Sequence, residues 1–161
     1  PNGNIFACTI KCQNKIIAGT LGAVSGSNLS IDFSDGFNIL LERKDTLDEL
    51  LKQVKQNNDR HSVRMTMIKG KQIPKNMQER VDEAKQLFQN EIQLMEWLES
   101  KAKEMYDAKE KYQTNIQLIS NKRLYPGVVA KLNKRTWRAE REYDKTKVSF
   151  QDHQWHLEPL I

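Results

Sequence analysis

The chain has 161 residues, of which 38% are hydrophobic and 29% are charged, a balance typical of a protein with a large water-exposed surface. No apolar run reaches the roughly 18 residues that a membrane-spanning helix needs, so we expect no membrane span. The net charge of +5 raises the question of nucleic-acid binding. The opening residues 1–4 are turn-like and match no signal-peptide pattern, so we expect a fragment of a longer protein.

The segment from Asn4 to Phe33 consists of short runs of Ile, Thr, Val, Leu and Ala separated by glycines. In an extended chain, Ile5, Ala7 and Thr9 would face one way, and Phe6, Cys8 and Ile10 the other. This alternation predicts short, half-buried strands with turns at residues 12–15 and 25–28. Such strands are typical of a parallel β-helix, and a small sandwich is the alternative.

A first helix follows. Its seam positions repeat at steps of three and four: Leu47, Leu51, Val54, Asn58, His61, Met65 and Ile68. Thr46 and Glu49 have the form of a capping box, which predicts a start at Thr46, while the apolar Leu40 and Leu41 would move the start to Asn38. The polar seam residues Asn58 and His61 have two interpretations. They fix the register of a helix pair, or His61 is a ligand or a pH sensor.

A second helix is predicted from Lys75 to about Tyr112, on the order of 55 Å long. Its seam consists of Met77, Val81, Ala84, Phe88, Met95, Leu98, Ala102 and Met105, interrupted by Glu91. The steps of four and three are those of a coiled coil. Gly70 and Pro74 suit a tight reversal between the helices. We therefore expect an antiparallel hairpin over residues 39–113 with its turn near 69–75.

Charge is divided unevenly between the two helices. Basic residues gather in the first helix and turn, and again in the C-terminal part: Lys52, Lys55, Arg60, Arg64, Lys69, Lys71, Lys75, Lys131, Lys134, Arg135, Arg138 and Arg141. The second helix carries acidic residues: Glu79, Asp82, Glu83, Glu91, Glu96 and Glu99. Opposite charges favour pairing across a coil. The alternative is a nucleic-acid-binding coil that uses the basic first helix and the C-terminal basic patch.

The hairpin also offers candidate partner-binding residues. Trp97 lies beside the seam, and tryptophan is enriched at interface hot spots, so it either packs within the coil or docks a partner. The basic turn presents Lys69, Lys71 and Lys75. We expect these residues to contact a protein partner or to mediate self-association through the coil.

After the hairpin, five further strands are predicted over residues 115–119, 128–132, 137–143, 147–150 and 154–157. Pro126 and Gly127 predict the turn that restarts the sheet. Residues 1–38 and 114–161 would thus form one β portion. The fold class is α+β, with a short β-helix-like or β-sheet portion interrupted by a long antiparallel coiled-coil hairpin.

Several segments carry a family resemblance: Leu124-Tyr125-Pro126-Gly127-Val128-Val129-Ala130-Lys131-Leu132, then Val148-Ser149-Phe150-Gln151-Asp152-His153, the closing Leu157-Glu158-Pro159-Leu160, and the upstream Lys15-Ile16-Ile17-Ala18-Gly19-Thr20. Together they resemble the bacterial flagellar assembly protein A family, over nearly the whole chain. The resemblance implies a right-handed β-helix interrupted near its end by a coiled-coil hairpin. It also implies a cytoplasmic, non-enzymatic role in flagellar assembly or cell-pole organisation, with flagellar or polar proteins as partners.

Metal and catalytic chemistry is not supported. Cys8, Cys12, His153 and His156 are of the residue types that bind zinc, but four steps along one strand would separate the cysteine Cα atoms by roughly 13 Å. We expect buried thiols instead. The sequence contains no nucleophile elbow or phosphate-binding loop. We therefore expect no enzyme and no cofactor.

Overall fold

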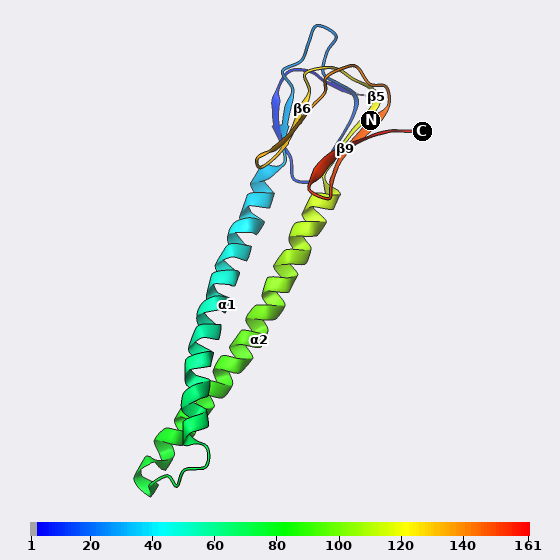
Figure 1. Ribbon diagram of the computed structural model, residues 1–161. Coiled ribbons are helices and arrows are strands. Elements are labelled where there is room, and N and C mark those ends of the chain that lie inside the picture. Colours follow the sequence, from blue (N-terminus) through cyan, green and yellow to red (C-terminus); the bar gives the residue numbers. More distant parts are fainter. Residues whose placement is uncertain (1–2) are drawn as a thin grey trace. The chain divides into compact units, whose positions relative to one another are not determined.

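The computed structural model describes residues 3–161 and has an α+β fold, as predicted. The chain divides into two compact units. The described residues of the β unit are 3–41 and 107–161, and the arm contains residues 42–106. Two long helices, α1 (Ser34–Ile68) and α2 (Gln78–Asn115), supply the arm and begin and end in the β unit (Figure 1).

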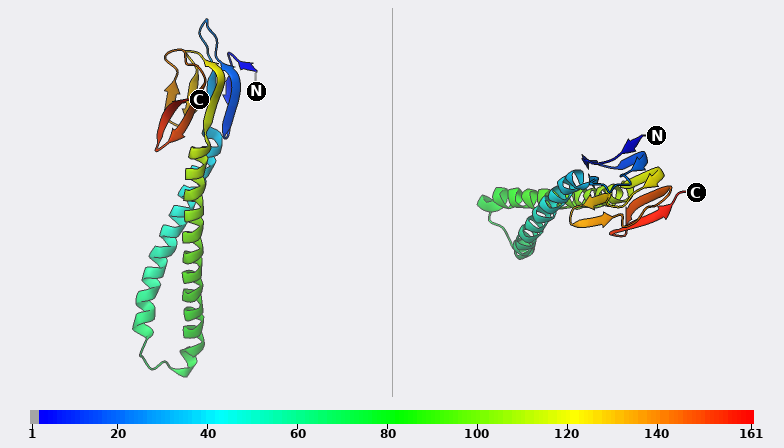
Figure 2. Two further views of the ribbon diagram at one scale, coloured as in Figure 1. Left: turned by 90° about the vertical axis from the view of Figure 1, so that its right-hand side faces the viewer. Right: turned by 90° about the horizontal axis from the view of Figure 1, so that it is seen from above.

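The first six strands alternate between two sheets. They are β1 (Asn4–Ile5), β2 (Thr9–Lys11), β3 (Lys15–Leu21), β4 (Ser30–Asp32), β5 (Gln117–Leu124) and β6 (Val129–Leu132). Strands β1, β3 and β5 pair in parallel in one sheet, and β2, β4 and β6 do so in the other. Each pair of strands therefore adds one strand to each sheet, and the two sheets are seen beside each other in Figure 2. The helices are inserted between β4 and β5.

Three antiparallel strands complete the sheets. Strand β7 (Arg135–Arg138) pairs with β6, β8 (Thr146–Gln151) pairs with β5, and β9 (Gln154–Pro159) pairs with β8. The strand predicted over 137–143 is too long, because β7 ends at Arg138 and Tyr143 forms only an isolated bridge with Leu124. The segment 4–12 is also not one strand. The chain turns a corner at residues 6–8, so β1 and β2 belong to different sheets.

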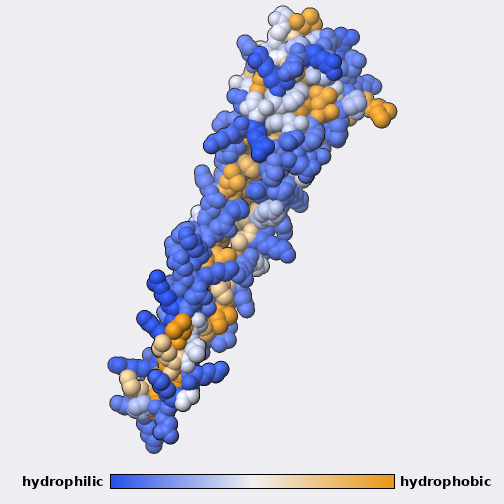
Figure 3. Space-filling view, viewed as in Figure 1, coloured by the Kyte–Doolittle hydropathy of each residue, from blue (hydrophilic) through white to orange (hydrophobic). Residues whose placement is uncertain are grey.

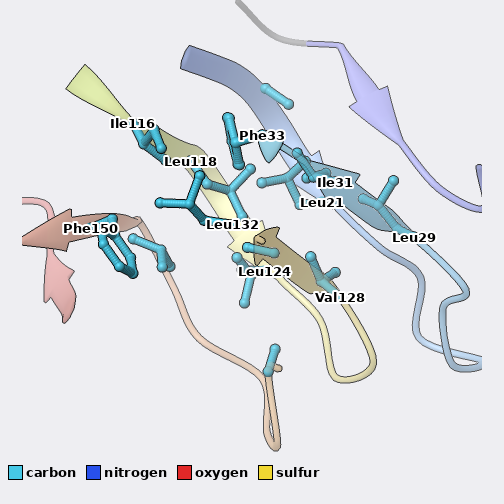
Figure 4. Packing of buried hydrophobic residues seen from close by; sticks show 14 of the residues in the cluster. Leu21, Leu29, Ile31, Phe33, Ile116, Leu118, Leu124, Val128, Leu132 and Phe150 are labelled. Atoms are coloured by element: carbon cyan, nitrogen blue, oxygen red, sulfur yellow. The ribbon is translucent and has the colours of Figure 1, made fainter. Parts of the chain in front are cut away.

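The core lies between the two sheets (Figure 4). Leu118 and Leu124 of β5, Ile31 of β4 and Phe150 of β8 are almost fully buried. Side chains of this size stabilise a fold by about 1.5–3 kcal/mol each when removed from water. The core therefore joins strands that precede the helices to strands that follow them.

Helix α1 begins at Ser34, earlier than either predicted start. The Ser34 N–H donates to Asp32 Oδ1 at 2.9 Å, so an aspartate satisfies a free N–H at the start of the helix. Thr46 lies inside the helix, where its hydroxyl donates to the Glu42 carbonyl at 2.9 Å. The predicted capping box at Thr46 is therefore wrong.

The chain reverses direction between α1 and α2. Gly70 has φ 88°, the left-handed conformation expected just after a helix end, and a short 3₁₀ turn, η1 (Lys75–Met77), precedes α2. Met77 falls in that turn with 49% of its surface exposed, so it is not a seam residue as predicted. Helix α2 continues to Asn115, a little beyond the predicted end.

Candidate functional site

The seam of the arm is only half-buried. The predicted apolar seam positions in α1 and, from Val81 onward, in α2 are less exposed than their neighbours. Within residues 42–106, all described by the structure, Leu98 is the single buried side chain, at 3% exposure. A two-helix pair of this kind leaves much of its apolar surface open to water. Figure 3 shows the resulting band of apolar residues along the arm.

One ion pair and one histidine–carboxylate hydrogen bond join the helices of the arm. Lys55 Nζ lies 2.7 Å from Glu99 Oε1, and His61 Nδ1 lies 2.8 Å from Glu91 Oε2. These contacts confirm the antiparallel register, because residues further along α1 meet residues earlier in α2. The second pair joins the polar interruptions of the two seams. The contact between His61 and Glu91 was not predicted from the sequence, because each residue was interpreted only as a polar interruption in the seam of its own helix.

The turn end of the arm is hollowed. Helices α1 and α2 stand apart there and the loop bridges them (Figure 2). One hollow of about 580 Å³ has apolar walls from Met65, Ile68, Ile73 and Phe88. Lys69, Lys71 and Lys85 also line it. A second hollow of about 360 Å³ adjoins it along Ile73, Pro74 and Met77. We call the surface formed by these two hollows the tip.

The tip lies in a basic segment of the chain. Between Arg60 and Gln78 there are five basic residues and no acidic one. Residues 111–139 form a second acid-free segment with seven basic residues, so the excess positive charge is shared between the arm and the β unit. Positive charge around an apolar hollow is complementary to an acidic partner that also carries apolar side chains.

The predicted partner-binding residues do not form one site. Lys69 and Lys71 line the same hollow, and Lys75 is exposed in η1 nearby in sequence. Trp97 lies about 28 Å along α2 from Gln78, at 1.5 Å per residue. It is 53% exposed and stands three residues after Leu94, which is 45% exposed. Residues at this spacing are neighbours on a helix surface, so Trp97 and Leu94 form a separate apolar patch.

The remaining sequence candidates lie in the β unit. Cys8, at the corner before β2, is exposed, so the expected burial of its thiol is wrong, and Cys12 is half-buried. His153 lies in the β8–β9 turn, while His156 Nε2 is 3.2 Å from the Gln151 carbonyl oxygen. Among residues 3–161 no three His, Cys, Asp or Glu side chains gather in a way that could hold a metal.

Gly127 lies in the turn between β5 and β6. Its φ is 86°, its N–H donates to the Ala139 carbonyl at 2.9 Å, and the Ser27 hydroxyl donates to the Pro126 carbonyl at 3.1 Å. A Cβ at Gly127 would lie 2.6 Å from the Ser27 carbonyl oxygen. The turn therefore depends on glycine and has a structural role.

None of the helices formed by the described residues is long and apolar enough to cross a membrane. Comparison with protein families gives a match over residues 1–155 to the model described as flagellar assembly protein A beta solenoid domain. The match covers the inserted arm and the β unit as far as residue 155. Comparison with curated proteins and with solved structures gives no match.

Proposed function

Because the chain belongs to the flagellar assembly protein A family, we propose that it is a non-enzymatic scaffold or protein-interaction module. The family assignment supports a role associated with flagellar assembly. We place this role in the bacterial cytoplasm, with flagellar or cell-pole proteins as partners. Its β portion would be the end of a right-handed β-helix, a geometry that the alternation of parallel strands between two sheets favours.

We propose that the arm is the binding element and that the partner binds at its tip. Apolar walls from Ile68, Ile73 and Phe88 adjoin the lysines of an acid-free segment. The partner that fits this combination is an acidic protein segment whose apolar side chains enter the hollows. Lys69 and Lys71 would pair with its carboxylates, and Lys75 would add long-range attraction.

The patch of Leu94 and Trp97 supports a second contact. Both side chains are about half-exposed on the same stretch of α2, and tryptophan is one of the residues enriched at the energetic centres of interfaces. We propose that this patch mediates self-association of the arm. The partner at the tip and the second copy at the patch would therefore bind at different places.

Reversal of charge at the tip tests the proposal. The double variant Lys69→Glu/Lys71→Glu removes the proposed contacts, and Lys52→Glu/Lys103→Glu makes the same change in net charge at exposed positions elsewhere on the arm. Both are compared with the unmodified chain in affinity capture from a nuclease-treated bacterial lysate. A captured protein is then purified and its affinity for each chain is measured.

We expect the unmodified chain and the control variant to bind the same protein and the tip variant to lose it. Equal binding by all three would contradict a role for the tip. If nuclease treatment removed all tip-dependent material, and binding to DNA or RNA fell steeply with salt, the basic arm would be a nucleic-acid-binding surface instead.

A further inference from the structure

The β unit contains a hollow of its own, distinct from those at the tip. Its volume is about 360 Å³, within the range of small-molecule sites. Three structural parts meet there. They are the first turn of α1 with the last turns of α2, the β6–β7 turn, and the β8–β9 turn. All the residues that line it belong to the β unit.

Hydrogen bonds between these parts hold the walls in place. The Asn133 N–H donates to Ser34 Oγ at 2.7 Å, which ties the β6–β7 turn to the first residue of α1. The Arg135 guanidinium donates to the His153 carbonyl and so joins the two turns. Trp155 Nε1 donates to the Arg135 carbonyl at 3.3 Å. The hollow is therefore formed by connected backbone segments before any ligand enters.

The polar side chains that line the hollow are donors or cations. Lys109, Lys134, Arg135 and His153 contribute positively charged or protonatable groups, and none of the lining residues is a carboxylate. The side chain of Lys109 is only 16% exposed, and its Nζ lies 3.7 Å from Glu110 Oε1. The hollow therefore has a cationic lining with one largely buried lysine.

Gln113 adds a neutral hydrogen-bonding group to the lining. This residue is 7% exposed and lines the hollow. None of the side-chain hydrogen bonds described involves Gln113, and its amide is not one of the fully buried, unpaired polar groups, which are Asn58 Nδ2 and Ser149 Oγ. The amide can therefore exchange a contact with water for one with a ligand. A bound acceptor would satisfy the amide N–H of Gln113.

The remaining walls are apolar. Phe37, Leu132 and Phe150 are each at least nine-tenths buried and line the same hollow. We propose that this hollow binds a small organic anion, with its phosphate or carboxylate beside Lys109, Lys134 and Gln113 and its compact apolar part against Phe37 and Phe150. This site is independent of the proposed partner contact on the arm.

Titration of the isotope-labelled chain with phenyl phosphate tests the site. The Gln113 side-chain amide and the backbone amides of residues 133–135 and 153 are followed by NMR. We expect saturable shifts at these residues, weaker binding of inorganic phosphate, which lacks the apolar part, and no such shifts with phenol, which lacks the anion. Benzoate distinguishes the two anion chemistries, because a carboxylate site binds it as tightly as phenyl phosphate and a phosphate site binds it more weakly.

Two variants test the assignment to these residues. Gln113→Glu places a carboxylate in the hollow at nearly the same size and should abolish binding. Lys134→Gln changes an exposed side chain that the fold does not need, and should weaken binding by about threefold or more. Lys111→Gln, an exposed lysine that does not line the hollow, should leave the affinity unchanged. Absence of saturable shifts, or equal weakening by Lys134→Gln and Lys111→Gln, would overturn the proposal.

Discussion

His61 Nδ1 lies 2.8 Å from Glu91 Oε2, so the polar interruptions in the two apolar seams of the arm meet each other. The Glu91 side chain is 24% exposed and that of His61 is 41% exposed. A hydrogen-bonded pair in a mostly apolar seam disfavours sliding of one helix along the other, because a shift in register would separate the two groups and place them mostly against apolar side chains. The relationship supports the register interpretation of His61.

A double-mutant cycle measures this pair. Glu91→Leu and His61→Leu each leave one polar group in the seam without its partner, whereas the double variant places two leucines opposite each other. We expect the double variant to be more stable than the sum of the single changes predicts, with a coupling energy of about 0.5–1 kcal/mol for a partly exposed pair. Thermal unfolding followed by the helical circular dichroism signal gives the four stabilities. Additive effects would show that the pair does not couple the helices.

Leu98 should contribute more to the arm than any other seam residue. Its side chain is buried, whereas Leu94, one turn earlier, is 45% exposed. Leu98→Ala removes buried methyl groups and should cost about 2–4 kcal/mol, while Leu94→Ala should change stability by at most about 0.5 kcal/mol. Urea unfolding at low protein concentration avoids any contribution from self-association. Similar losses in both variants would contradict the described packing of α2.

Gly127 and Gly26 allow two energetic costs of adding a side chain to be measured separately. One is the strain of a left-handed backbone, and the other is the clash of the new Cβ with a neighbouring group. Both glycines have positive φ, 86° and 92°, but a Cβ at Gly127 would lie 2.6 Å from the Ser27 carbonyl oxygen, while one at Gly26 would meet nothing within 4 Å. Gly26→Ala should therefore cost only about 1–2 kcal/mol for the left-handed backbone. Gly127→Ala should cost clearly more, because a backbone group must also move. Denaturant unfolding followed by tryptophan fluorescence compares them, and equal losses would contradict the close approach to Ser27.

Tyr112 should make the stability of the β unit depend on pH in the alkaline range. Its hydroxyl donates to the Phe33 carbonyl at 2.8 Å, and its ring packs 5.9 Å from that of Phe37. Burial raises the pKa of Tyr112 above its ordinary value of 10.0. The neutral phenol is thus favoured in the folded state, and its stabilising contribution is complete below about pH 10 and is lost as pH rises through the folded-state pKa.

Tyr112→Phe is the matched variant for this effect. It removes the hydroxyl and keeps the ring, so at neutral pH it should cost about 1 kcal/mol. The difference in unfolding free energy between the two proteins should shrink as pH rises above 10, because the unmodified protein then loses the contribution that the variant lacks. A difference that stays constant from pH 8 to 12 would show that the phenol is not favoured in its neutral form.

Helices and seams were predicted well because their pattern is local. Steps of three and four residues located the seam of both helices, and Gly70 marked the reversal. The start of α1 was missed because Thr46 and Glu49 match a capping box, whereas the actual capping contact, Asp32 Oδ1 to the Ser34 N–H, depends on where β4 ends.

Features that depend on long-range pairing could not be predicted. The contact of His61 with Glu91 requires the exact register of the hairpin. The anion site requires the sheet topology, since Lys109, Arg135 and His153 come from three elements far apart in the sequence. For the same reason, strand alternation alone did not show that β1 and β2 belong to different sheets.

The most direct test of the account is to replace the arm. A chain in which residues 42–106 are exchanged for a short turn is compared with the unmodified chain in affinity capture at moderate salt, after tryptophan fluorescence has shown that its β unit is folded. We predict that a protein partner is retained by the unmodified chain and lost without the arm. Retention of the same proteins by both chains would contradict the central claim, because binding would then reside in the β unit.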